Sequence, residues 1–218
     1  VFLYSMGGDS KREDRKTIIN NLKANIRQAG EIKGDRGNDD TQFSVVYIFD
    51  ADNKGVAARL AEVLNEVKEV FPALTANIFP ANSTFATIEN IKIGCHIITG
   101  ADNNTGKLED ILMPLMRDSS EQIYDGAVAY LQTHFDDARL FPLKLSNNAG
   151  VTTEVRSIRM GDKLKYDEQK SIVGVIGQLQ KSGGSNTVCI GQTDYLNLAK
   201  IQANQKCIEF VDFINSFI

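Results

Sequence analysis

The strongest constraint on the fold is the run Phe43-Ser-Val-Val-Tyr-Ile-Phe49, in which every residue except the serine is apolar, β-branched or aromatic. A run of this kind is typical of a central strand that is buried on both faces. The next segment, Val56–Val70, carries apolar residues at helical spacing with charged residues between them, and Phe71-Pro72 ends it. The sequence therefore predicts a buried strand, a short loop and an amphipathic helix.

The rest of the chain continues this alternation of strands and helices. Further strands are predicted at Val1–Met6, Ala76–Phe79, Ile91–Ile98 and Thr187–Ile190. Further helices are predicted around the apolar stripe Ile18, Ile19, Leu22 and Ile26, then at Gly106–Arg117, Ile123–Phe135 and Lys170–Gln180, with two helical segments ending at Ile218. This order predicts an α/β fold with a mainly parallel central sheet flanked by helices on both faces.

Two segments interrupt the alternation. Gly30–Thr41 is polar and charged, which predicts a surface loop, and Ser146–Gln169 combines glycines and basic residues with an alternating pattern typical of a hairpin. We therefore expect an α/β domain over residues 1–145 and a C-terminal helical extension over residues 146–218, packed on the same domain.

Composition excludes several classes of protein. A chain of 218 residues buries enough surface to need neither disulfides nor a structural metal, and its net charge of −4 leaves no overall basic field for nucleic acid. The three cysteines, Cys95, Cys189 and Cys207, lie far apart in apolar runs, which favours buried thiols and a cytoplasmic protein. No apolar run approaches the roughly 20 residues of a membrane span.

The clearest candidate site is Asp50-Ala-Asp-Asn-Lys-Gly55, which follows the predicted strand. Ligands bind at the carboxyl ends of strands in open α/β sheets. If the chain stays extended, the Asp50 and Asp52 side chains share one face at about 6.6 Å, and their repulsion costs roughly 2.5 kcal/mol. A cation between them reverses that cost, and hard oxygen ligands suit Mg²⁺ or Mn²⁺. The alternative is structural, with Asp52 or Asn53 capping the next helix.

These residues resemble a known family. Asp50-Ala-Asp-Asn-Lys-Gly55 is similar to the D-x-D-x-x-G motif of the Toprim domain, the metal-binding catalytic module of topoisomerases, bacterial primases and small nucleases. The chain also resembles a Toprim-related bacterial family of unknown function in a glycine turn, Ser5-Met-Gly-Gly8, and in a D-N-x-x-G-x-L-E-D segment, Asp102–Asp110. The resemblance implies a Toprim-like (Rossmann-like) fold, Mg²⁺ and action on nucleic-acid phosphodiester bonds.

The resemblance also implies which residues form the site. Asp50 and Asp52 correspond to the motif's metal-binding and catalytic carboxylates, and Glu109 is the expected third member because Ile91–Ile98 leads toward the same sheet edge. Glu109 and Asp110 equally suit the first turn of a helix, where the helix dipole favours acids. The family's Glu-Gly element, taken as general acid and base, does not precede Gly7 here; it lies upstream of Val1 or this branch has lost it.

Each of the other candidate functional residues also has an ordinary structural explanation. Gly7-Gly8-Asp9-Ser10 suits a tight turn better than a phosphate cradle, and His96 and His134 suit a core position and a helix end. The basic groups Lys11–Lys16 and Arg156–Lys165 are typical of solvated faces but also suit local contact with DNA or RNA, as does Lys170 with a phosphate. A non-catalytic metal- or nucleotide-binding module in a defence or regulatory assembly is the alternative to an enzyme.

Overall fold

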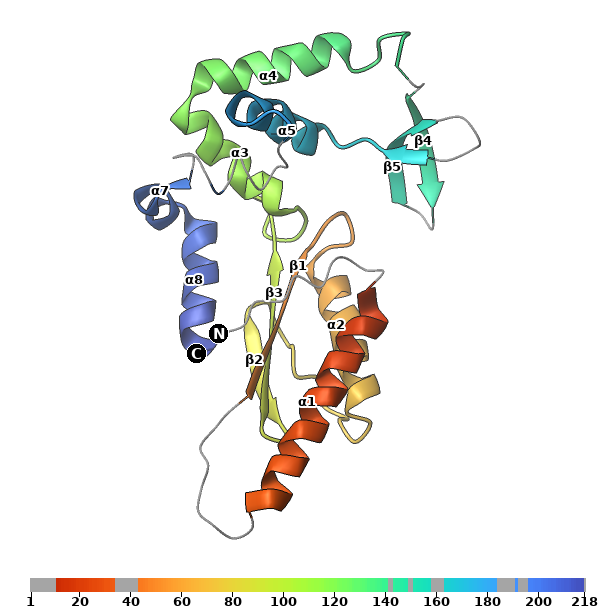
Figure 1. Cartoon of the computed structure of the whole chain (residues 1–218), viewed down its shortest axis with the longest axis vertical. Helices are drawn as coiled ribbons and strands as arrows, with labels where there is room; N and C mark the ends of the chain where they lie inside the picture. Colours follow the sequence, from red (N-terminus) through yellow and green to blue (C-terminus); the bar gives the residue numbers. More distant parts are fainter. Residues whose placement is uncertain are drawn as a thin grey trace. The chain divides into compact units, whose positions relative to one another are not determined.

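The protein is described by a computed structural model, which covers residues 11–33, 43–140, 143–148, 151–157, 163–183, 191 and 196–217. The chain forms two compact units (Figure 1). Unit 1 comprises Val1–Gly106 together with Glu209–Ile218, and unit 2 comprises Lys107–Ile208. The units therefore divide the chain at other positions than residue 145, where the sequence placed a domain boundary.

Unit 1 contains a sheet in the order β1-β3-β2, formed by Phe43–Asp50, Ile91–Ile98 and Thr84–Ile88. The first two strands are parallel, with Phe43 opposite Ile91 and Asp50 opposite Ile98, whereas β2 runs antiparallel to β3. The described residues thus form a small mixed sheet, and the prediction of a mainly parallel central sheet is not confirmed. The coarser prediction of an α/β protein is confirmed.

The middle strand of this sheet is β3, which is buried along nearly its whole length. Within the described residues β1 pairs only with β3, and Ile48 on β1 is 42% exposed. The expectation that Phe43–Phe49 is buried on both faces is therefore wrong. Tyr47 is buried and Phe49 packs on the core, so the buried side chains of this apolar run lie on one face of the sheet.

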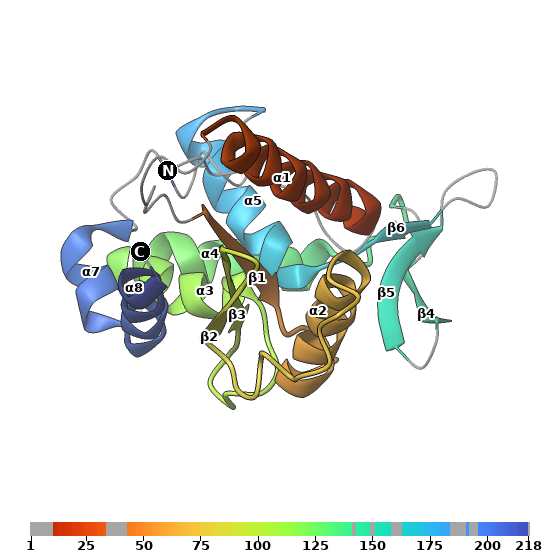
Figure 2. The ribbon, with the colours of Figure 1, turned by 90° about the horizontal axis from the view of Figure 1, so that it is seen from below.

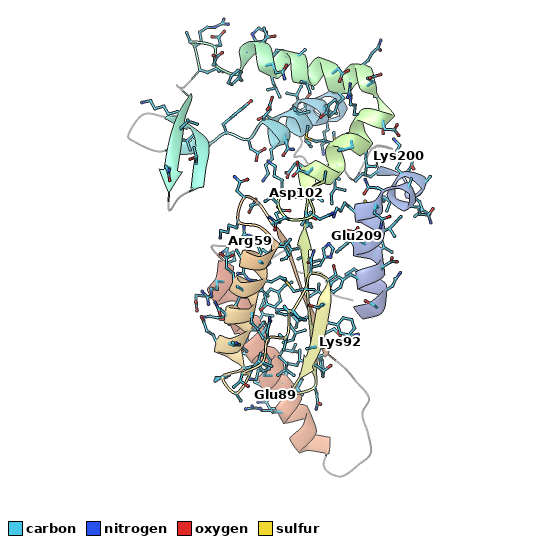
Figure 3. All side chains as sticks on the ribbon, turned by 180° about the vertical axis from the view of Figure 1, so that it is seen from behind. Arg59, Glu89, Lys92, Asp102, Lys200 and Glu209 are labelled. Carbon is cyan, nitrogen blue, oxygen red and sulfur yellow. The ribbon has the colours of Figure 1, made fainter. Side chains whose placement is uncertain are left out.

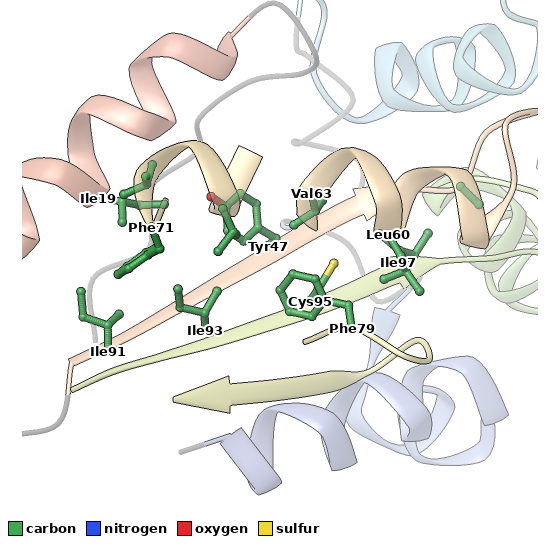
Figure 4. Packing of buried hydrophobic residues seen from close by; sticks show 13 residues of the cluster. Ile19, Tyr47, Leu60, Val63, Phe71, Phe79, Ile91, Ile93, Cys95 and Ile97 are labelled. Atoms are coloured by element: carbon green, nitrogen blue, oxygen red, sulfur yellow. The ribbon is translucent and has the colours of Figure 1, made fainter. Parts of the chain in front are cut away.

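Helices lie on both faces of the unit 1 sheet. The helices α1 (Arg12–Lys33) and α2 (Val56–Val70) run side by side and cover one face (Figure 2), where their apolar residues pack against alternate residues of β3 (Figure 4). On the other face, His96 contacts Phe210 and Phe213 of α8 (Gln205–Phe217). Of the predicted α1 stripe, Ile19 is buried but Ile18 is exposed.

Within the described residues, unit 2 contains three helices packed together, α3 (Leu108–Ser119), α4 (Glu121–His134) and α5 (Glu168–Gln180), with the shorter helix α7 (Leu198–Ala203). Its core is formed by Leu112, Met116, Ala127, Ile172, Val173 and Ile176. A second antiparallel sheet consists of β4 (Leu143–Asn148), β5 (Val151–Ser157) and β6 (Lys163–Lys165). The hairpin expected within Ser146–Gln169 is confirmed.

Most predicted elements are present, and one is not. Ala76–Phe79 is a loop, in which the Asn77 side chain accepts a hydrogen bond from the Phe79 N–H, while Phe79 itself is buried in the core. The strand β2 was not predicted because Thr84-Phe-Ala-Thr-Ile88 is only half buried. The predicted strands Val1–Met6 and Thr187–Ile190, and most of the predicted loop Gly30–Thr41, lie outside the described residues. No described helix has the length and apolar character to cross a bilayer.

Candidate functional site at the carboxyl edge of β1 and β3

The strands β1 and β3 end at the same edge of the sheet because they are parallel and Asp50 lies opposite Ile98. The loop that carries Asp50–Gly55 and the loop that carries Asp102–Gly106 therefore leave the sheet side by side. The Ala51 N–H donates to the Ile98 carbonyl at 2.9 Å, which extends the pairing one step beyond β1. Asp50 is the last residue of β1 and lies at its carboxyl edge as predicted, but among the described residues the central strand is β3 and not β1.

The two loops are joined by backbone hydrogen bonds. The Asp52 N–H donates to the Gly106 carbonyl at 2.7 Å, and the Gly106 N–H donates back to the Asp52 carbonyl at 3.1 Å. The Val56 N–H donates to the Asn104 carbonyl at 2.9 Å, so the second loop also satisfies a donor at the first turn of α2. The Asp50–Gly55 loop and the Asp102–Gly106 part of the second acidic segment thus form one structural unit.

Gly55 is required by this close approach. It has a φ of +84°, and a Cβ atom built there would lie 3.2 Å from the Asn104 side-chain oxygen. Any L-residue at this position meets both a strained backbone and a crowded neighbour. The glycine of the D-x-D-x-x-G motif therefore has a structural reason here, which is the docking of one loop on the other.

Asp52 is paired with a buried arginine. Its φ of 48° ends the extended backbone, so the extended geometry on which the expectation of about 6.6 Å for Asp50 and Asp52 depends is not present. Its carboxylate lies 2.5 Å from the Arg59 guanidinium, and Arg59 also donates to the Asp50 carbonyl at 3.0 Å and to Glu62 at 3.0 Å. Figure 3 labels Arg59 on α2. Arg59 therefore balances negative charge that, on the sequence analysis, a metal ion was expected to balance.

The helix-capping alternative for Asp52 and Asn53 is also wrong. The residue that precedes α2 is Gly55, and no side chain caps that helix end. Asp52 acts through its backbone bridge to Gly106 and its ion pair with Arg59. Its side chain is 45% exposed, so one side of the carboxylate faces solvent.

Asp102 forms the turn that the second loop needs. Its carboxylate accepts hydrogen bonds from the Asn104 and Thr105 N–H groups at 2.9 and 2.8 Å and from the Thr105 hydroxyl at 2.5 Å. These hydrogen bonds hold the pKa of Asp102 below its ordinary value, and the bond from the Thr105 hydroxyl has the largest effect. The interpretation of Asp102-Asn103 as a turn is confirmed, and Asn103 has the positive φ typical of one.

Glu109 and Asp110 lie in unit 2, where they hold α3 against α5. Asp110 accepts from the Lys107 N–H at 2.8 Å and from the Gln169 amide at 2.6 Å, and Glu109 lies 3.8 Å from the Lys170 ammonium. Lys107 itself pairs with Asp167 at 2.5 Å. Both acids occupy the first turn of α3, as the helix-dipole reading expected. The role of Glu109 as a third metal ligand stays a prediction.

The remaining sequence candidates have ordinary structural roles. His96 is 5% exposed, and its Nδ1 lies 2.8 Å from the Ser83 hydroxyl, which confirms a satisfied core histidine. His134 ends α4, and Lys170 faces Glu109. Burial raises the pKa of the Cys95 thiol to about 12, which makes it unreactive at neutral pH. Gly7-Gly8-Asp9-Ser10 and Arg159 lie outside the described residues.

Metal ligands are sparse in this arrangement. Within the described ranges, no three His, Cys, Asp or Glu side chains are grouped so that they could hold a metal ion. The oxygen donors at the loop edge still have the hard chemistry that Mg²⁺ takes, and one or two protein carboxylates with water and phosphate suffice for that ion. The residues present therefore fit a weakly held Mg²⁺, provided that it displaces Arg59 from Asp52.

Two charged residues of α2 were not singled out from the sequence. Arg59 and Glu66 are nearly fully buried on the apolar stripe of α2, among Leu60, Val63 and Val67. Charged residues at buried positions of an amphipathic helix are a signal of ion pairs in the folded protein, because such residues are rarely fully buried unless they are paired.

Comparison with family models, with curated proteins and with solved structures finds no match to this chain.

Proposed function

We propose that the carboxyl edge of β1 and β3 is the metal site of a Toprim-like (Rossmann-like) domain that acts on nucleic-acid phosphodiester bonds. The observation that carries the proposal is the docking of the Asp50–Gly55 loop on the Asp102–Gly106 loop through paired backbone bonds. This docking fixes two acidic segments at the edge where open α/β sheets bind ligands. A loop that served only to connect a strand to a helix does not need such a bridge.

In this proposal Asp50 and Asp52 hold one Mg²⁺ ion. When bound, the ion would polarise a phosphoryl oxygen and stabilise the leaving oxygen. Asp52 must exchange its Arg59 partner for the ion, and Arg59 keeps Glu62 and the Asp50 carbonyl as acceptors after the exchange. Glu109 would join as a third ligand only after leaving Lys170.

A second candidate is a metal- or nucleotide-binding module without catalysis. The ion pair between Asp52 and Arg59 favours it, because the arginine already neutralises the carboxylate that a catalytic metal needs. In this case the two docked loops have a structural role, and a bound metal ion or nucleotide would act as a signal that another protein recognises.

The experiment is a cleavage assay on a labelled single-stranded and a labelled double-stranded oligonucleotide with Mg²⁺ or Mn²⁺. The enzyme predicts cleavage that EDTA abolishes and that Asp50→Asn reduces by at least about a hundredfold, the scale of one metal-held catalytic step. Asp14→Asn, an exposed aspartate on α1, is the matched control and should cleave like the wild type. Metal binding without any cleavage would reject the enzyme and support the module.

A further inference from the structure

A pocket of about 220 Å³ lies between the first turn of α1 and the Arg59–Glu66 stretch of α2, and Phe49 and Lys54 complete its lining. Its lining includes four cationic side chains, two carboxylates and two apolar residues. These are Arg12, Arg15, Lys54, Arg59, Glu62, Glu66, Phe49 and Val63. A pocket of this volume has room for several water molecules or for one small anion such as phosphate.

Both carboxylates of the pocket are already committed to cations. The two oxygens of Glu66 accept from Arg15 at 3.0 and 2.8 Å. The two oxygens of Glu62 accept from Lys54 at 2.8 Å and from Arg59 at 3.0 Å. The lining itself therefore carries two more positive than negative charges, while Arg12 and Arg59 also pair with Glu69 and Asp52 outside it.

The cations are also held in place. Arg15 lies over the Phe49 ring with its guanidinium carbon 5.0 Å from the ring centre, and its side chain is only 11% exposed. Arg12 pairs with Glu69, and its buried Nε–H has no hydrogen-bond partner among the residues that the structure describes. A buried donor of this kind is uncommon, and an oxyanion is the group that satisfies it best.

We propose that this pocket binds the phosphate group of a nucleotide or of a nucleic-acid backbone. Guanidinium groups match the oxygens of phosphate in pairs, and the pocket brings together three arginines from two helices, of which Arg15 and Arg59 are nearly buried. The inference goes beyond the proposed metal site, because the pocket uses its own cations and needs no divalent ion.

The variants that test the pocket leave no carboxylate without a partner. Arg12→Gln leaves Glu69 paired with Lys16 at 2.8 Å, and Lys54→Gln leaves Glu62 paired with Arg59. The control is Arg27→Gln, on the same helix as Arg12 but outside the pocket, which leaves Glu89 beside Lys23 at 3.5 Å. All three variants remove one cation and should fold like the wild type.

The measurement is calorimetric titration of the full chain with pyrophosphate and, separately, with a single-stranded oligonucleotide, at low salt and in EDTA. We expect saturable binding of at least one probe, weakened about three- to tenfold by Arg12→Gln and by Lys54→Gln but not by Arg27→Gln. Pyrophosphate alone would identify a free or terminal phosphate as the ligand, and the oligonucleotide alone would identify the backbone. No binding of either probe, or an equal loss with Arg27→Gln, would overturn the inference. Because EDTA is present, failure here leaves the metal proposal to its own test.

Discussion

The Arg59 guanidinium lies 2.5 Å from the Asp52 carboxylate while the same side chain holds the backbone carbonyl of Asp50. Arg59 is buried, and Asp52 is half exposed. One arginine thus connects both acidic residues of the loop to α2. If Asp52 binds a metal ion as proposed, that binding must compete with the ion pair that stabilises the loop.

Replacing Arg59 should therefore change stability and metal affinity in opposite directions. Arg59→Gln removes a buried charged donor, and the free energy of unfolding should fall by about 1.5–3 kcal/mol. If Asp52 is a metal ligand, the same variant should bind Mn²⁺ more tightly, because the competing cation is gone. Thermal melting and Mn²⁺ titration on one preparation measure both. A destabilised variant with unchanged Mn²⁺ affinity would show that Asp52 is not a ligand.

The two docked loops should make Gly55 intolerant of a side chain. Gly55→Ala meets a φ of +84° and the nearby Asn104 oxygen, and should lower stability by about 1–2 kcal/mol. The control is Gly126→Ala in α4, where nothing lies within 4 Å of the added Cβ. That change should raise stability by about 0.5–1 kcal/mol. Equal effects in urea unfolding would contradict the docked geometry.

The parallel neighbours β1 and β3 show how much the sequence could predict. Phe43–Phe49 and Ile91–Ile98 were identified as strands from their apolar runs, and the assumption that they are neighbours placed Asp50 and Asp102 at one edge. Local patterns also identified α2 at its observed limits. These features depend on residues close together in the chain, which is the range that periodicity describes.

The ion pair of Asp52 with Arg59 could not be predicted in the same way. It depends on the left-handed conformation of Asp52, which follows from the bridge to Gly106, a residue far along the chain. The mixed sheet was missed for a similar reason, because β2 is a half-buried strand whose pairing with β3 carries no strong local pattern. Long-range contacts thus decided the features that the sequence left open.

Asp102 should contribute stability that depends on pH. Its pKa in the folded protein lies below the ordinary value of 3.8, so its contribution is complete above that value and is lost as pH falls through the folded pKa. Asp102→Ala should therefore be less stable than the wild type at pH 7, and the difference should shrink below pH 3.8. Unfolding curves at several pH values measure it. A difference that grows in acid would contradict the turn.

Mutation of Glu109 separates the two roles considered for its carboxylate, which are a metal ligand and an ion-pair partner of Lys170. If it is a ligand, Glu109→Gln should weaken Mn²⁺ binding by about tenfold or more while changing stability by less than about 1 kcal/mol. Asp110→Asn is the control, since Asp110 serves the Lys107 N–H and Gln169 and should affect stability alone. If Glu109→Gln and Lys170→Gln change only stability, by equal amounts, Glu109 serves only its ion pair with Lys170.

The most direct test of the account is Mn²⁺ titration of the wild type and of Asp50→Asn, followed by calorimetry. Asp50 ends β1 at the edge where the two loops meet, and it is the residue on which the proposed metal site depends. The account predicts one Mn²⁺ bound by the wild type and an affinity at least about tenfold lower in Asp50→Asn, with both proteins folded. Equal Mn²⁺ affinity in the two proteins would contradict the metal site.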